Sequence, residues 1–215
     1  MIINQSLKLS ALILAVALSS CAKKYVPQTG DIAFQVSANS DFVKAITDVS
    51  AQDDPIKFAH VGIVVAGYND SYMILEAVPK GGVKLTSMEE FLADADSING
   101  APGVVIKRVN CEFPVDKAVK KAFTFIGQKY DWNFLPDNGK MYCSELVYES
   151  FKDAEGHPLF HSAPMNYYDA EGNIPQYWID LFKKLGTDIP QGIEGTSPQG
   201  MSQEESLTEV YRYFR

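Results

Sequence analysis

The sequence predicts an α+β domain built around an antiparallel sheet and preceded by a short leader. Hydrophobic residues make up 46% of the chain and charged residues 21%, which is typical of a globular protein. A length of 215 residues suits one domain of ordinary size. Strand-like and helix-like segments are mixed without the regular alternation that a parallel sheet requires. The net charge of −8 also argues against a nucleic-acid binder, which needs a basic face.

Residues 1–20 have the features of a bacterial lipoprotein signal peptide. Lys8 is their single charged residue, and residues 9–18 form an almost wholly apolar run. This run is too short to cross a bilayer, which requires about 20 apolar residues. It ends in a Leu-Ser-Ser-Cys motif at Cys21 that is similar to a lipobox. We expect cleavage before Cys21 and a lipid on its thiol, although an ordinary cleaved signal peptide with an incidental cysteine is the alternative.

The leader sets our expectations for domain organisation and location. We expect residues 21–28 to form a lipid-anchored tether and residues 29–215 to form the folded domain. Such an anchor would hold the protein on a membrane of the bacterial cell envelope, on the periplasmic side or at the outer membrane.

The spacing of apolar residues predicts the elements of the domain in order. Apolar runs bounded by turn residues predict strands, and apolar residues three and four apart predict helices. Ser87 and Glu90 form a capping-box pattern at the start of one helix. The expected strands span residues 32–36, 60–65, 72–78, 83–85, 104–109 and 207–214, and the expected helices span residues 41–49, 87–92, 116–126, 142–151 and 175–185.

Cys143 is the first candidate for chemistry. It lies where a polar loop, residues 137–140, leads into an amphipathic helix. The positive end of the helix dipole favours a thiolate at such a position. The apolar residues Leu146, Val147 and Phe151 would hold this helix, and with it the sulfur, in place. The alternative is a small buried thiol that only packs, which is the most common role of a free cysteine.

His60 and Glu76 are the second and third candidates. His60 starts an apolar strand, and Glu76 interrupts the next one, with a hairpin turn at residues 67–70 between them. A buried carboxylate needs a partner, and an imidazole N–H would serve. With Cys143 they would supply a nucleophile, a base and a residue that orients the base. The alternatives are a surface or core histidine and an outward-facing strand glutamate.

Five short motifs carry a resemblance to a known family. They are TGDIAF at residues 29–34, FAHVGI at 58–63, ILEA at 74–77, GQKYDW at 127–132 and YCSELV at 142–147. With these motifs the sequence resembles the permuted papain-like amidases of the YiiX/YaeF type, which are relatives of the NlpC-type cell-wall hydrolases. In the unpermuted relatives the cysteine motif comes before the histidine motif, whereas here it comes last. The resemblance implies a circularly permuted papain-like fold.

The resemblance also implies roles for individual residues. Cys143 would be the nucleophile, His60 the base and Glu76 the third member, at a position that varies between branches of the family. Tyr130 matches the active-site tyrosine of the family and would donate a hydrogen bond to the oxyanion. Its alternative is a packing aromatic residue at a helix end. The implied function is a cofactor-free cysteine hydrolase of the cell envelope that cleaves an amide or peptide bond.

Other functions are open on the sequence alone. The same thiol could serve a lipid-directed acyl hydrolase or acyltransferase, and a papain-like cleft could serve a lipoprotein that binds without catalysis. A metal held by the three candidate side chains is a further alternative. His157 and His161 also have a spacing that binds metal on a helix, but Pro158 disfavours a helix there, so we expect no metal site.

Two further features are open to interpretation. We expect Cys111, which follows a predicted strand, to pack in the interior. The pairs Tyr167-Tyr168 and Tyr177-Trp178 form an aromatic-rich stretch, which is either part of the core or a wall of a substrate cleft.

Overall fold

A computed structural model describes residues 25–37, 41–49, 55–69 and 71–215. The expectations for the signal peptide and for Cys21 therefore lie outside the described residues. Among the helices of these residues, none combines the length and the apolar character that a membrane span requires.

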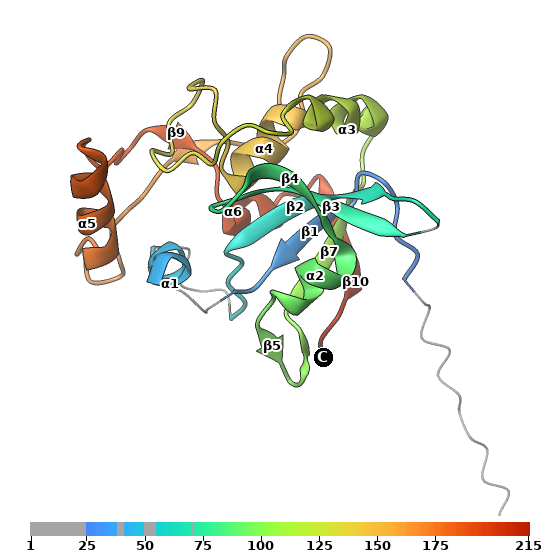
Figure 1. Ribbon diagram of the computed structural model, residues 1–215, viewed down its shortest axis with the longest axis horizontal. Coiled ribbons are helices and arrows are strands. Elements are labelled where there is room, and N and C mark those ends of the chain that lie inside the picture. Colours follow the sequence, from blue (N-terminus) through green and yellow to red (C-terminus); the bar gives the residue numbers. More distant parts are fainter. Residues whose placement is uncertain (1–24, 38–40, 50–54, 70) are drawn as a thin grey trace, which may run out of the picture.

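The centre of the fold is a six-stranded sheet in which every neighbouring pair is antiparallel (Figure 1). The strand order is β10-β7-β1-β2-β3-β4. Its strands are β1 (Ile32–Gln35), β2 (His60–Ala66), β3 (Tyr72–Val78), β4 (Gly82–Ser87), β7 (Val104–Val109) and β10 (Leu207–Arg212). These are the six strands that the apolar runs predict, and the α+β class with an antiparallel sheet is confirmed.

Helices cover both faces of this sheet. Helices α3 and α4 lie over one face and α2 lies on the other, while α1 and α5 stand together beyond one side of the sheet (Figure 1). The helices are α1 (Asp41–Asp48), α2 (Met88–Ala93), α3 (Val115–Thr124), α4 (Cys143–Ser150), α5 (Gln176–Leu185) and α6 (Pro198–Ser202). The Ser87 side chain caps α2 by accepting the backbone N–H of Glu90 at 3.0 Å, as the sequence pattern predicts.

The elements that the sequence did not predict are the shortest ones. They are α6 and the strands β5 (Ser97–Ile98), β6 (Ala101–Pro102), β8 (Ala163–Pro164) and β9 (Glu194–Gly195). A two-residue strand contains no repeat of the side-chain period, so no apolar pattern can reveal it.

The larger hydrophobic core fills the space between the sheet and α4. Val61, Ile63 and Leu75 of β2 and β3 pack there with Leu146 and Val147 of α4, and all five are fully buried. A smaller core lies on the other face of the sheet, under α2. Because α4 packs against β2 and β3, its first residue is held at a fixed place relative to these strands.

The expectation for Cys111 is wrong. This thiol is exposed, because β7 ends at Val109 and the following residues 110–112 all face solvent. The strand continues far enough to bury its apolar residues but stops before the cysteine.

Candidate active site

The β2–β3 hairpin brings His60 and Glu76 together at one end of the sheet. Glu76 lies opposite Gly62 in the antiparallel register, and His60 precedes Gly62 by two residues. Residues with this relationship point to the same face of a sheet. Only glycine fits between the two side chains at position 62. A Cβ there would lie 2.4 Å from Cγ2 of Ile74 and 3.3 Å from Cβ of Glu76.

Glu76 points at His60 and uses both carboxylate oxygens. Nε2 of His60 lies 2.6 Å from Oε2 of Glu76. The other oxygen, Oε1, accepts a hydrogen bond from the hydroxyl of Thr86 in β4. Glu76 is 4% exposed, and the ring of Phe91 packs 5.9 Å from the His60 ring. The carboxylate is therefore a fully partnered buried group, not an outward-facing strand glutamate.

The electrostatics of this pair favour a charged histidine. Burial lowers the pKa of His60, but hydrogen bonds to Cys143 and Glu76 and the negative charges of both raise it to about 10. Burial raises the pKa of Glu76, yet the hydrogen bond and charge of His60, followed by Thr86, bring it below its usual value. At neutral pH the site thus favours an imidazolium next to a carboxylate.

Cys143 is the first residue of α4 and is 5% exposed. Tyr142 caps the helix in an extended conformation, and its backbone N–H donates to Oε2 of Glu145 at 3.3 Å. The hydroxyl of Tyr142 accepts the backbone N–H of Thr196 at 3.1 Å. The start of α4 is therefore tied both to its own first turn and to the distant segment that contains Thr196.

The three candidate side chains lie in series, with the imidazole in the middle. His60 is hydrogen-bonded to Glu76, the Cys143 side chain is among the groups that raise its pKa, and all three residues line one cavity. Nε2 is committed to Glu76, so Nδ1 is the ring nitrogen that is left for the sulfur. Helix α4 covers the face of the sheet opposite to α2. This is the order that a nucleophile, a base and an orienting residue require.

Tyr130 reaches this site through a short parallel bridge to Met141. The Asp131 N–H donates to the Met141 carbonyl, and the Met141 N–H donates to the Lys129 carbonyl, both at 3.1 Å. Tyr130 thus lies close to Cys143, although it precedes it by thirteen positions in the chain. Burial, and then the negative charge of Cys143, raise the pKa of Tyr130 well above its usual value. The hydroxyl therefore keeps its proton and can donate a hydrogen bond.

Two cavities meet at Cys143 and Tyr130. The first, of about 250 Å³, has mainly apolar walls. The second, of about 360 Å³, contains His60 and Glu76 and has Lys84 at its wall. A group bound to the sulfur therefore has an apolar space on one side and a charged space on the other.

Two residues of the aromatic stretch belong to the core and also line a cavity. Tyr167 and Trp178 are each 2% exposed and belong to the hydrophobic core, and both also line the first cavity. Their rings meet edge to face, with centroids 5.1 Å apart. Tyr168, in contrast, is 43% exposed.

His157 and His161 do not come together as a metal site. Nδ1 of His157 lies 3.2 Å from Oδ2 of Asp153, whereas Nδ1 of His161 lies 2.9 Å from Oε2 of Glu204. Each imidazole thus has a separate acidic partner on the surface.

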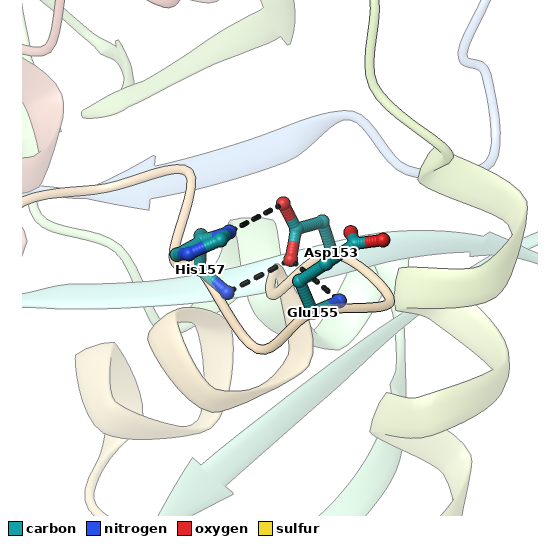
Figure 2. Close-up of side chains that lie close together, drawn as sticks. All are labelled: Asp153, Glu155 and His157. Carbon is teal, nitrogen blue, oxygen red and sulfur yellow. Dashed lines mark hydrogen bonds and ion pairs between the residues drawn. The ribbon is translucent and has the colours of Figure 1, made fainter.

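Asp153, Glu155 and His157 form a group whose potential ligand atoms lie within 4.8 Å of one another, and within the described ranges it is the one such group (Figure 2). The Asp153 carboxylate already accepts the backbone N–H groups of Glu155 and His157, at 3.0 and 2.8 Å. These bonds account for the cluster as the closure of an exposed loop. The potential ligand atoms of Cys143, His60 and Glu76 do not form such a group in the described part of the chain.

Several residues at the site were not found from the sequence. Thr86, Ser144 and Thr196 are buried polar residues that contact Glu76 or line the first cavity. In the β3–β4 register Lys84 lies opposite Glu76, and Thr86 points to the same face of the strand as Lys84. The contact between Thr86 and Glu76 therefore follows from the register, which the sequence alone does not give. For Thr196 no local pattern indicates that it lies near Cys143.

The fold and the site define a permuted papain-like protein of the cysteine hydrolase superfamily. The features that define it are the antiparallel sheet, the thiol at a helix N-terminus, the His–Glu pair and the position of the cysteine last in the chain. The chain belongs to the permuted papain-like amidase family YaeF/YiiX, also called C92, which it matches over residues 26–211. It is 32% identical over 203 residues to the uncharacterized protein YiiX of Escherichia coli strain K12, covering 93% of each chain.

A solved structure shares the fold. The structure described as metalloprotein yiiX from Escherichia coli O157:H7 aligns with a TM-score of 0.69 and 28% identity. The alignment covers 89% of this chain and all of that one. The likeness thus extends over the whole domain, beyond the motifs around the site.

Proposed function

We propose that the protein is a cysteine hydrolase of the cell envelope that cleaves an amide or peptide bond through Cys143, His60 and Glu76. The observation that carries the proposal is the buried His60–Glu76 pair, which lines one cavity with Cys143 at the start of α4. Membership of the permuted papain-like amidase family supports it.

The geometry suggests how each residue would act. The Cys143 thiolate attacks the carbonyl carbon, and the negative charge moves to the carbonyl oxygen, where Tyr130 and the Cys143 N–H can donate hydrogen bonds. As the C–N bond breaks, the His60 imidazolium gives its proton to the leaving amine. Neutral His60 then takes a proton from water, which attacks the thioester and releases the acid and the thiolate. Glu76 orients the ring and stabilises its charged form.

The location of the enzyme is part of the proposal. The Leu-Ser-Ser-Cys motif at Cys21 supports a lipid anchor at the membrane of the envelope. The substrate would then be a peptide, an amide or a lipid-like molecule that is present in that compartment.

A lipid-directed acyl hydrolase or acyltransferase is the second candidate. The mainly apolar cavity beside Cys143 favours it, because an acyl chain needs such walls. Both candidates share the acyl-enzyme and differ in the bond that is cleaved and in the acceptor. Product analysis with and without an added amine or alcohol acceptor separates them.

The purified protein should hydrolyse at least one member of a panel of acyl amides, peptides and esters. Cys143→Ala should abolish this turnover, whereas Cys111→Ala, at an exposed thiol, should leave it unchanged. A thiol-directed activity probe should label the wild type at Cys143. If a folded wild-type protein binds such ligands and does not turn them over, the protein is a binding module and the proposal is wrong.

A further inference from the structure

The first cavity contains no charged side chain. Among the described residues that line it there is no Asp, Glu, Lys, Arg or His, and its deep walls include Phe134, Tyr167 and Trp178. A volume of about 250 Å³ would hold a group of roughly eight non-hydrogen atoms, if each takes the 30 Å³ of a water molecule. A carboxylate or ammonium group in this space would lose much of its hydration and meet no opposite charge in compensation.

Two hydroxyl groups in the same wall have no hydrogen-bond partner within the part of the chain that the structure describes. They are Oγ of Ser144 and Oγ1 of Thr196, both buried atoms of residues that are 0% and 9% exposed. A buried hydroxyl without a partner is costly, and such groups in native proteins call for an explanation. Ser144 follows Cys143 directly and both residues line the cavity, so rotation of either hydroxyl toward the cavity would bring it to a polar atom of a ligand near the reacting carbonyl.

The chemistry assigns the two cavities to the two halves of a substrate. His60 must give its proton to the leaving group, so the leaving group lies in the cavity that contains His60. Lys80, Lys84 and Asp94 also line that cavity, which suits a polar group. The acyl half then lies on the other side of Cys143, in the uncharged cavity.

We propose, building on the hydrolase function above, that the uncharged cavity selects the acyl half of the substrate. It takes an apolar acyl group that carries one hydrogen-bonding group next to the scissile carbonyl, and this group bonds to Ser144 and Thr196. An N-acylated apolar amino acid has this chemistry, whereas an acyl group with an acidic side chain does not.

Matched substrates with the same leaving group test the proposal. We would compare p-nitrophenyl esters of N-acetyl-leucine, N-acetyl-glutamate and 4-methylpentanoic acid, the last of which has the leucine chain without the acetamido group. We expect kcat/KM for the leucine ester to exceed that for the glutamate ester by at least about tenfold. Thr196→Val should lower kcat/KM for the leucine ester by roughly three- to tenfold and leave the 4-methylpentanoyl ester nearly unchanged.

A labelling experiment tests the cavity without turnover. The two reagents are N-butyl iodoacetamide and N-(3-carboxypropyl) iodoacetamide, whose tails differ by a terminal carboxylate. Mass spectrometry of the peptides gives the labelling rate at Cys143 relative to the exposed Cys111 in the same chain. We expect this ratio to be at least about tenfold higher for the butyl reagent. Ala163→Phe, at an exposed position on the cavity wall, should reduce the preference.

The two experiments separate this proposal from the proposed function. Labelling that prefers the butyl tail, without turnover of any ester, would contradict the hydrolase function and keep the apolar selectivity of the cavity. Turnover with equal rates for the leucine and glutamate esters would overturn the acyl assignment and keep the hydrolase. Equal labelling by both reagents, or a preference that Ala163→Phe does not change, would also overturn it.

Discussion

Nε2 of His60 lies 2.6 Å from Oε2 of Glu76, and the two residues belong to neighbouring strands of one hairpin. The contact runs diagonally past Gly62, which lies opposite Glu76. Because Gly62 has no side chain, the carboxylate can reach the ring. Because a sheet register holds this pair, the orientation of the imidazole does not depend on a flexible loop. The site therefore has a rigid half, the hairpin, and a second rigid half, the start of α4.

Glu76→Gln should reduce turnover less than the loss of Cys143 or His60. The amide keeps the shape and the hydrogen-bonding reach of the carboxylate but loses the charge that stabilises the imidazolium. We expect kcat/KM to fall on the order of 10- to 1,000-fold. The double variant with Cys143→Ala should be no less active than Cys143→Ala alone, because both residues act on one step. Additive losses in the double variant would show that Glu76 acts elsewhere.

Thr86→Val should weaken the support of Glu76. The hydroxyl of Thr86 lowers the pKa of Glu76, so its removal raises that pKa and should move the acid limb of the pH profile of kcat/KM to higher pH. The buried Oε1 also loses its partner, which should cost about 1–3 kcal/mol in the free energy of unfolding by urea. Thr86→Ser is the matched control and should keep the wild-type pH profile. An unchanged profile in Thr86→Val would make the contact merely structural.

Tyr130→Phe tests the oxyanion role. Loss of one donor at this position should lower kcat on the order of 10- to 1,000-fold, with little effect on KM. The ring packing against Phe134 and its neighbours is retained, so thermal stability should change little. Tyr168→Phe, at a residue that is 43% exposed, is the control and should be neutral. A neutral Tyr130→Phe would assign this residue to packing.

Glu145 should make stability depend on pH. Burial raises its pKa to about 8 from the usual 4.5, although the N–H of Tyr142 opposes the rise. The protonated form is favoured in the folded state, so its contribution to the free energy of unfolding is complete below pH 4.5 and is lost as pH rises through 8. Glu145→Gln, which can still accept from Tyr142, should be more stable than the wild type by a margin that is small at pH 5 and grows to several kcal/mol by pH 9, at about 1.4 kcal/mol per pKa unit. Urea unfolding at several pH values measures this difference in the free energy of unfolding. Parallel pH curves for the two proteins would contradict the prediction.

Cys21 should be the first residue of the mature chain and should carry a lipid. The Leu-Ser-Ser-Cys motif after a short apolar run motivates this prediction. Mass spectrometry of a membrane fraction should find the lipid mass on a peptide that begins at Cys21. Cys21→Ala is the control and should leave the protein unprocessed. A soluble mature form that is cleaved elsewhere would rule the anchor out.

The apolar pattern was sufficient to predict the central sheet and the five longer helices. A strand such as β7 is bounded by where its apolar run stops, because burial of those side chains stabilises it. The pattern also placed Cys143 at the start of a helix and Glu76 within a buried strand, since a polar residue in an apolar run is conspicuous. The same reasoning was wrong for Cys111, which is exposed. At the end of a strand, a shift of one residue in where the strand stops decides whether a side chain is buried.

The sequence by itself thus determined the longer elements, the three candidate side chains and the family to which they point. Only the tertiary structure decided which oxygen of Glu76 meets His60, that Thr86 holds the other, and that Ser144 and Thr196 share the wall of one cavity. These contacts join residues that are distant in the chain. They depend on strand register and on how α4 and the C-terminal segment pack, and local propensity carries no information about either.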